Sequence, residues 1–478
     1  DESYIELALM GRKLGHNVIV VIEKPSETDL IINVSKRLGI EAKVGMRVKL
    51  YSKGGGKWEK SAGDASKFGL STNEILNAYE KFLNADMKEC FELLHFHLGS
   101  QIPNVRKIGI ATQEAARIYA ELSKLGVPLK YIDVGGGLGV DYDGSKTNFD
   151  SSMNYSLQEY AGGITYNIME VCKETGVRQP NIVSESGRAI TAHHSMLVVS
   201  VKDIITQGET STLLGKVKAS DHKVIGDMLH NLETVNQKNY QECYHDILYL
   251  REEAFNLFNL GYLSILERGK VETLFWECCK KIVRHAKQAK YVPDDLEALF
   301  EAVADKYVCN FSVFQSILDH WAIDHLFPIV PIQRLNEKPN RQATIADITC
   351  DSDGKIDKFI DLRDVRDSLP LHEIKPNEDY YLGIFLVGAY QDIMGDFHNL
   401  FGSLNEIHVR QRTDGSPEIE NIIQGNTCGD MLEMVDYSLE DLVKNVETKA
   451  KLSGKSADEI KWMVETYQKN LKGYTYLS

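Results

Sequence analysis

Helix-like and strand-like segments alternate through the first 190 residues, and this alternation constrains the fold more than any other feature. The spacing of apolar residues predicts helices at 4–14, 27–38, 72–83, 108–125 and 157–175, and strands at 17–22, 42–50, 91–98, 129–134 and 182–185. Such alternation is typical of a parallel sheet with helices outside it. Because a closed barrel has eight strands, we predict a (β/α)8 TIM-type barrel whose three N-terminal strands are missing from this sequence.

Three further regions follow the predicted barrel. An alternating segment at 194–205 predicts a long β-strand that begins a second domain. Apolar positions between 216 and 329 have helical spacing and predict a helical bundle inserted into that domain. Strands resume after residue 330 as an antiparallel sheet or barrel, and helical spacing returns near the end. The predicted regions are a partial barrel at 1–190, a β domain at 191–215 and 330–425, a bundle at 216–329 and a helical tail at 426–478.

Composition excludes several classes of protein. The 478 residues are 43% hydrophobic and 26% charged, which is typical of a soluble protein with more than one domain. No apolar run is long enough to span a membrane and no signal peptide opens the sequence, so we predict a cytoplasmic protein without a membrane partner. Eight scattered cysteines without a C-x-x-C pair argue against a zinc site or a disulfide framework. The net charge of −15 disfavours a nucleic-acid partner and suits an enzyme for cationic substrates.

Three consecutive glycines, Gly135, Gly136 and Gly137, follow the predicted strand at 129–134. A turn without side chains leaves backbone N–H groups bare, so it can approach a phosphate closely. The dinucleotide fingerprint fails because Val140 occupies the position of its third glycine, and a P-loop fails because Ser145 occupies the lysine position. Alone, such a turn is more often a simple connection, so the neighbouring strand ends must decide its function.

Reactive groups in β/α barrels lie at the C-terminal ends of the strands. His97 lies at the end of the predicted strand at 91–98, Glu185 is the last residue of the strand at 182–185, and Arg188 follows it. Singly, the histidine could be structural and the other two a local ion pair. Together with the glycine turn they supply a phosphate site, a flat ring and a carboxylate. Pyridoxal phosphate needs this combination, because a carboxylate keeps its pyridine nitrogen protonated.

Several stretches of the sequence resemble a known family. Residues 95–101, 133–144, 185–188, 350–357 and 388–390 resemble the fold-type III, alanine-racemase-like pyridoxal-phosphate decarboxylases. The stretches 350–354, 387–392, 398–402 and 473–477, with the helical insert and tail, resemble the biosynthetic arginine decarboxylases in particular. The resemblance covers essentially the whole chain. It implies decarboxylation of L-arginine to agmatine and carbon dioxide, as the first step of putrescine and spermidine biosynthesis.

The resemblance also implies a role for each matching residue. His97 would stack on the cofactor ring, and Glu185 would pair with the pyridine nitrogen. Cys350 would reprotonate the substrate carbon, and Asp351 with Asp353 would receive the distal cationic end of the amino acid. The residues implied for the cofactor phosphate are Ser100, Gly135, Gly136, Gly137, Gly187, Arg188 and Tyr390. The further substrate-binding positions implied are Asp133, Gly139 and Asp141.

The resemblance extends to partners and metal. In the family the groups matching Cys350 and Asp351 come from a second subunit, which implies a homo-oligomer, dimer or tetramer, with active sites shared between subunits. The family also uses Mg²⁺, but the sequence identifies no ligands for it. Residues 351–357 lack the ligand spacing of an EF-hand loop.

One departure from the family concerns the lysine that binds the cofactor covalently. It lies on the first barrel strand of the family, and no lysine here has that context; Lys67 matches another family motif. We therefore expect residues 1–478 alone to be inactive. The alternatives are a decarboxylase of ornithine, lysine or diaminopimelate, and a non-catalytic, cofactor-free regulator like the antizyme-inhibitor relatives of ornithine decarboxylase.

Overall fold

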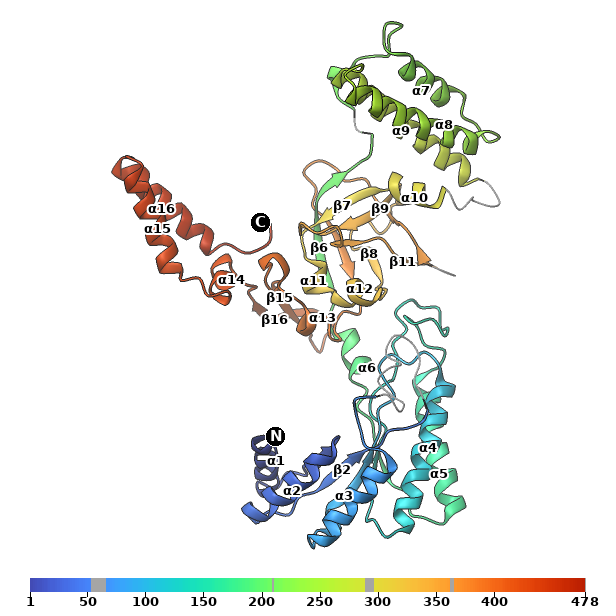
Figure 1. Cartoon of the computed structure of the whole chain (residues 1–478), viewed down its shortest axis with the longest axis vertical. Coiled ribbons are helices and arrows are strands. Elements are labelled where there is room, and N and C mark those ends of the chain that lie inside the picture. The colour runs from blue at the N-terminus through green and yellow to red at the C-terminus, as the bar shows by residue number, and fades with distance from the viewer. Residues whose placement is uncertain (53–65, 209, 289–295, 362–364, 478) are drawn as a thin grey trace. The chain divides into compact units, whose positions relative to one another are not determined.

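The computed structural model describes the whole chain except residues 53–65, 209, 289–295, 362–364 and 478 (Figure 1). The chain divides into two compact units. Unit 1 comprises Asp1–Met196, Ala322–Pro328 and Phe385–Ile393, and unit 2 comprises Leu197–Trp321, Ile329–Ile384 and Met394–Ser478. Among the described residues, no helix combines the length and the apolar composition that crossing a bilayer requires.

Unit 1 contains a parallel five-stranded sheet in the order β1-β2-β3-β4-β5. Its strands are β1 (Val20–Ile22), β2 (Val44–Arg47), β3 (Phe91–His95), β4 (Tyr131–Asp133) and β5 (Asn181–Val183). Its helices are α1 (Glu2–Lys13), α2 (Pro25–Leu38), α3 (Thr72–Asn84), α4 (Val105–Lys124), α5 (Leu157–Thr175) and α6 (Gly187–Thr191). Helices α4 and α5 lie side by side (Figure 1). The five strands and the alternation predicted from the sequence are confirmed.

Local sequence signals explain where the helices of unit 1 begin and end. Ser71 and Glu74 form a capping box at the start of α3, and Ser156 and Glu159 form another at the start of α5. Helix α5 ends at Gly176, whose φ of 70° is the left-handed conformation that favours glycine. Every residue of β2 and β3 is buried, so the strand ends are held by the core.

Unit 2 is built on a seven-stranded sheet in the order β10-β9-β7-β6-β14-β8, with β13 also paired to β9. Its strands are β6 (Leu197–Ile205), β7 (Asp305–Cys309), β8 (Ile329–Pro331), β9 (Arg341–Ala346), β10 (Lys355–Ile356), β13 (Leu369–Leu371) and β14 (Tyr380–Ile384). Strands β11 (Phe359–Ile360) and β12 (Val365–Arg366) form a separate antiparallel pair. The pairs of this sheet are antiparallel, as predicted, except that β7, which was not predicted as a strand, pairs with β9 in parallel.

The helical insert is shorter than predicted. Its helices are α7 (Lys223–Thr234), α8 (Tyr240–Asn259), α9 (Ile265–Ala286) and α10 (Glu297–Val303). The prediction of helix as far as residue 329 is wrong at β7, which comes soon after α10 and pairs with β6 and β9. Along β7 the buried residues Tyr307 and Cys309 alternate with less buried ones. This alternation covers only a short strand, so it is hard to recognise in the sequence directly after a helix. The short helices α11 (Val313–Ser316) and α12 (Leu318–Ile323) come next.

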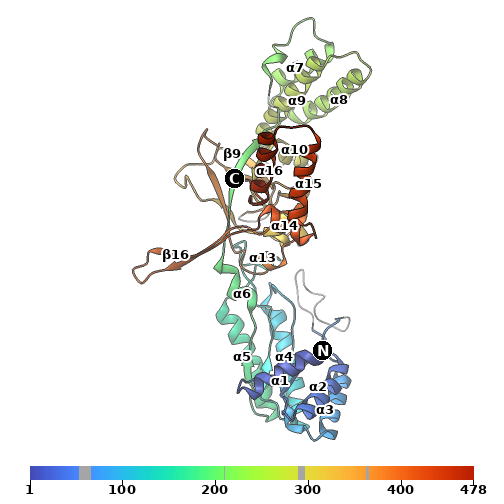
Figure 2. The ribbon, with the colours of Figure 1, turned by 90° about the vertical axis from the view of Figure 1, so that its left-hand side faces the viewer.

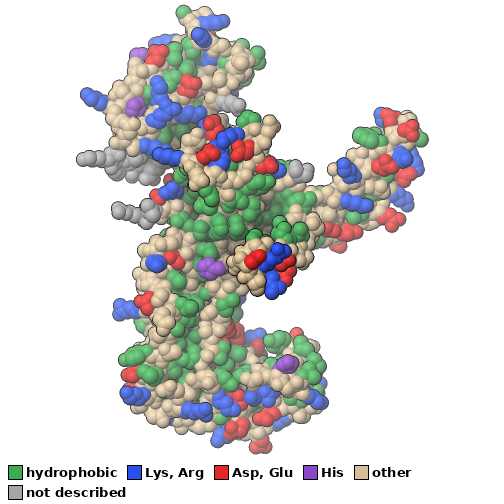
Figure 3. Space-filling model, turned by 180° about the vertical axis from the view of Figure 1, so that it is seen from behind, with side chains coloured by type: hydrophobic (Ala, Val, Ile, Leu, Met, Phe, Trp, Pro, Cys, Tyr) green, Lys and Arg blue, Asp and Glu red, His purple; other side chains and the backbone are tan. Residues whose placement is uncertain are grey.

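The last part of unit 2 contains a hairpin and three helices. Strands β15 (Glu406–Gln411) and β16 (Pro417–Ile423) were predicted as part of the large sheet, but among the described strands they form a separate two-stranded hairpin (Figure 2). Every residue of both strands is exposed. The short α13 (Gln391–Met394) precedes them, and the predicted helical tail consists of α14 (Cys428–Met434), α15 (Leu439–Leu452) and α16 (Ala457–Leu471). Acidic and basic side chains are intermixed on the tail, and several form ion pairs at i,i+4 spacing (Figure 3).

Candidate active site

The glycine turn after β4 has a conformation that other residues would not adopt. Gly135 and Gly137 have φ values of 65° and 108°. A Cβ atom on Gly135 would lie 2.5 Å from the carbonyl oxygen of Phe96, and one on Gly137 would lie 2.7 Å from Cδ1 of Ile102. The turn therefore requires glycine both for its backbone angles and for its close approach to the segment after β3.

The amides of this turn are less free than the sequence predicted. The N–H of Gly135 donates to Oδ1 of Asp133 at 2.9 Å, and the N–H of Gly136 donates to Nδ1 of His97 at 3.0 Å. The prediction of bare amides is therefore wrong for these two residues. Their hydrogen bonds fix the turn against the ends of β3 and β4 instead.

His97 lies directly against the turn. A Cβ atom on Gly136 would lie 3.1 Å from Cε1 of the ring, so the absent side chain makes room for the imidazole. Burial, followed by the nearby charges of Arg47 and His95, lowers the pKa of His97 to about 4, against a smaller opposing effect of Asp133. The ring is therefore neutral near pH 7, with Nδ1 accepting a hydrogen bond.

Arg188, Ser100, Tyr142 and Tyr390 form a cluster that we call the phosphate cradle. The buried Arg188 donates from Nε to Oγ of Ser100 at 3.1 Å and from Nη1 to the hydroxyl of Tyr142 at 3.0 Å. Its Cζ lies 4.8 Å from the ring centroid of Tyr390. The structure thus brings together three predicted phosphate residues and adds Tyr142, which the sequence analysis missed. Gly187, predicted with them, is the first residue of α6 and immediately precedes Arg188.

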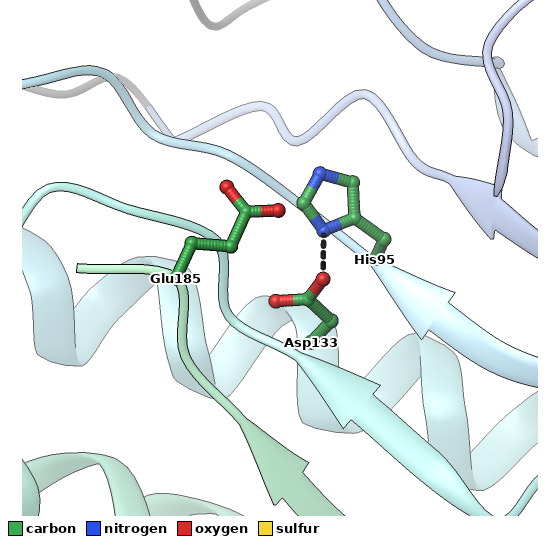
Figure 4. Close-up of side chains that lie close together, drawn as sticks. All are labelled: His95, Asp133 and Glu185. Carbon is green, nitrogen blue, oxygen red and sulfur yellow. Dashed lines mark ion pairs between the residues drawn. The ribbon is translucent and has the colours of Figure 1, made fainter. Parts of the chain in front are cut away.

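Glu185 follows β5 and lies close to two residues at the ends of neighbouring strands. One ligand atom from each of Glu185, His95 and Asp133 lies within 4.8 Å of the others, and their side chains point toward one another (Figure 4). Nδ1 of the buried His95 is 3.0 Å from Oδ2 of the buried Asp133, but the two atoms are not aligned as in a hydrogen bond. Glu185 itself is exposed, and its backbone N–H donates to Gly135.

The predicted substrate positions in unit 1 have local partners. Asp133 accepts the amide of Gly135, as described above. The N–H of Gly139 donates to the hydroxyl of Tyr155 at 3.0 Å, and Oδ1 of Asp141 accepts from Oγ of Ser152 at 2.7 Å. These contacts organise the turn and the loop after it, and a role in substrate binding stays a prediction.

Unit 2 carries a second group of predicted residues. Cys350, Asp351 and Asp353 lie in the loop between β9 and β10, and all three are exposed. Sγ of Cys350 is 3.6 Å from Oδ1 of Asn399, and His398 makes a short contact through Nε2 with Oδ2 of Asp351. His398 and Asn399 belong to the 3₁₀ turn η6 (His398–Leu400). Neither residue was predicted to have a role, although both lie in the stretch 398–402 that resembles the family.

Comparison with known proteins first defines the class. Residues 1–192 match the family model "Pyridoxal-dependent decarboxylase, pyridoxal binding domain". Residues 218–300 match the arginine decarboxylase helical bundle domain, and residues 429–477 match the arginine decarboxylase C-terminal helical extension. The cradle, the glycine turn and the adjacent carboxylate thus occur in a pyridoxal-dependent decarboxylase.

The individual relatives narrow the assignment, and the chain belongs to the biosynthetic arginine decarboxylase family. It is 48% identical over 483 residues to the biosynthetic arginine decarboxylase of Thermosynechococcus vestitus, covering 100% of this chain and 75% of that one. The crystal structure of the biosynthetic arginine decarboxylase of Campylobacter jejuni matches with a TM-score of 0.85 at 32% identity, covering 100% of this chain and 76% of that one. Diaminopimelate decarboxylase of Helicobacter pylori, at 18% identity, TM-score 0.56 and 91% and 76% coverage, shares the fold. The predicted family and fold class are confirmed.

Proposed function

We propose that the protein catalyses the pyridoxal-phosphate-dependent decarboxylation of L-arginine to agmatine and carbon dioxide, as a step in polyamine biosynthesis. The observation that carries the proposal is the identity of 42–48% to biosynthetic arginine decarboxylases along the whole of this chain. The helical bundle and the helical extension both match arginine decarboxylase models, which supports this substrate over other basic amino acids.

The residues of unit 1 fit pyridoxal phosphate. The phosphate cradle offers the buried guanidinium of Arg188, and the glycine turn excludes side chains from the space beside His97. The neutral ring of His97 is suited to stacking, and Glu185 offers a carboxylate for the pyridine nitrogen. When bound, the cofactor supplies an electron sink for the electrons left by the departing carboxyl group.

Two further residues near the turn, Asp133 and His95, lie beside Glu185. Asp133 contacts His95 and accepts the amide of Gly135, so a single carboxylate links the turn to the histidine beside Glu185. We propose that this arrangement keeps the carboxylate of Glu185 in place toward the pyridine nitrogen.

The residues of unit 2 supply the substrate half of the proposed site. Cys350 would return a proton from Sγ to the carbon that loses carbon dioxide, and its 3.6 Å contact with Asn399 would orient the thiol. Asp351 and Asp353 offer two carboxylates to the guanidinium of the substrate, which pairs with such groups through a planar fork.

The proposal extends to the oligomeric state, the metal and the cellular location of the protein. A homo-oligomer with active sites shared between subunits rests on the resemblance. Magnesium dependence rests on the resemblance alone. Within the described residues, the one group of three potential ligands is His95, Asp133 and Glu185, and Mg²⁺ prefers oxygen ligands over imidazole. A cytoplasmic location is supported by eight free cysteines.

The test is the substrate preference of the purified full-length protein. We expect carbon dioxide release from L-arginine with a higher kcat/KM than from ornithine, lysine or diaminopimelate, together with an absorbance band from protein-bound pyridoxal phosphate. Faster turnover of one of the other three amino acids would refute the assignment. A full-length protein that binds no pyridoxal phosphate would instead support a regulatory role.

A further inference from the structure

We infer that Trp321, Phe314 and His398 position Asp353 and Asp351 so that these carboxylates select a planar guanidinium over an ammonium group. The inference rests on the proposed function and names what gives the substrate half of the site its specificity. None of the three aromatic residues was predicted from the sequence. Together with the two aspartates they form what we call the acidic–aromatic cluster.

The cluster is a continuous chain of side-chain contacts. Trp321 donates from Nε1 to Oδ2 of Asp353 at 3.4 Å, and His398 contacts Oδ2 of Asp351 through Nε2. Phe314 lies between the two donors. Its ring centroid is 5.2 Å from that of Trp321 with the planes at 71°, and 4.6 Å from that of His398 with the planes at 54°. Both carboxylates are thus linked through one phenyl ring.

The segments that carry the cluster are fastened to the start of α11. The side chain of Phe314 is 6% exposed, and its carbonyl oxygen accepts the amide of Asp396 at 3.0 Å, two residues before His398. Asp347 accepts the amide of Val313 at 2.9 Å. A Cβ atom on Gly354 would lie 2.2 Å from Oδ1 of that same Asp347, so the loop that holds the two aspartates packs tightly against it. The donors and the carboxylates therefore share one anchor.

The exposed side of the cluster suits a flat cation. Trp321 is 48% exposed beside two exposed carboxylates, an unusual place for an indole that only packs. One oxygen of each carboxylate contacts a ring nitrogen, and the described residues place no hydrogen-bond donor on either Oδ1. A guanidinium can donate to such oxygens while it lies against an aromatic ring. An ammonium is more strongly hydrated and gains less from the same surface.

The test compares two tryptophan variants of the full-length holoenzyme. Trp321→Phe keeps an aromatic ring but removes the donor to Asp353, whereas Trp462→Phe makes the same change at an exposed position in α16. We expect Trp321→Phe to raise the KM for arginine and the calorimetric Kd for agmatine by about fivefold to tenfold, as for a lost hydrogen bond to a charged group. We expect kcat to change by less than about twofold. The ratio of kcat/KM for arginine to that for lysine should fall, and Trp462→Phe should match the wild type.

A second pair of variants separates positioning from packing at His398. His398→Gln retains a side-chain donor for Asp351, so its KM for arginine should stay within about threefold of the wild-type value. His398→Ala lacks this donor and should have a KM about tenfold higher than the wild type. Unchanged KM, Kd and selectivity in Trp321→Phe would overturn the inference, as would a loss confined to kcat. Should His398→Ala fail to fold, Trp321→Phe and His398→Gln still decide the matter. A wild-type protein that binds agmatine but does not decarboxylate arginine would refute the proposed reaction while supporting the guanidinium site.

Discussion

The phosphate cradle of unit 1 and the acidic–aromatic cluster of unit 2 are built in opposite ways. In the cradle, Arg188 is 4% exposed and hydrogen-bonded to Ser100 and Tyr142. In the cluster, Asp351 and Trp321 are exposed and only the anchoring ring beneath them is buried. A buried guanidinium held by two hydrogen bonds suits a cofactor that stays bound, and exposed carboxylates suit a substrate that enters and leaves. The phosphate cradle is thus held in place by burial, and the acidic–aromatic cluster is held by contacts with the buried ring of Phe314.

The largest expected effect is on the chemical step and involves unit 2 alone. Cys350→Ala should lower kcat for arginine by about 10²- to 10³-fold, because the proposed proton donor is lost. The cofactor absorbance spectrum should be unchanged, since the cradle lies in unit 1. Cys428→Ala, at a half-buried cysteine in α14, is the control and should keep the wild-type kcat. A loss of bound cofactor in Cys350→Ala would break the division between the two regions.

The next effect concerns cofactor affinity and involves unit 1 alone. Arg188→Ala should raise the Kd for pyridoxal phosphate about 100-fold, measured by fluorescence titration of the cofactor-free protein, because a buried charged partner of the phosphate is removed. Arg188→Lys should recover only part of this affinity, since an ammonium lacks the planar fork. The exposed Arg106→Ala is the control. Wild-type affinity in Arg188→Ala would place the phosphate elsewhere.

A third effect concerns the stability of the glycine turn. Gly135→Ala should lower the free energy of unfolding by about 2–3 kcal/mol, because the residue has a positive φ and its Cβ would lie 2.5 Å from a carbonyl oxygen. Gly162→Ala, at an open position inside α5, should instead leave stability unchanged or raise it by up to about 1 kcal/mol. Urea denaturation measures both. Equal effects of the two substitutions would show that the turn tolerates a side chain.

The smallest effect is a pH dependence from His97. Its pKa in the folded protein, about 4, is lower than the ordinary value of 6.5, so the unfolded chain binds more protons between these values. Stability of the cofactor-free protein should therefore be highest above pH 6.5 and fall as the pH drops toward 4. Between about pH 7 and about pH 5.5 the loss should be about 1 kcal/mol. Denaturation of the wild type and of His97→Gln across this pH range isolates the contribution of His97. The same dependence of the free energy of unfolding on pH in both proteins would contradict the lowered pKa.

The sequence predicted unit 1 better than unit 2 for a physical reason. The strands of unit 1 alternate with long amphipathic helices, so each strand is set off by a change of period. In unit 2, β7 follows a helix directly and β13 contains Pro370, so neither has a clear pattern. The sheet that joins them depends on contacts between residues far apart in the chain, which local patterns do not report.

The same contrast holds for the candidate site. Arg188 was predicted because it follows a strand whose position was evident and the barrel rule brings strand ends together, whereas Ser100 was predicted from the family resemblance. Tyr142, Trp321 and Phe314 were missed because only folding places them beside the predicted residues. The bare amides were predicted wrongly because the acceptors, Asp133 and His97, are side chains whose direction the sequence does not fix.

The most direct test of the division between cofactor and substrate halves is a crystal structure of the full-length protein with pyridoxal phosphate and agmatine bound. The account predicts that the phosphate contacts Arg188 and Ser100, and that the guanidinium of agmatine contacts Asp351 or Asp353 beside the ring of Trp321. A guanidinium held by residues of unit 1, or a phosphate away from Arg188, would contradict it.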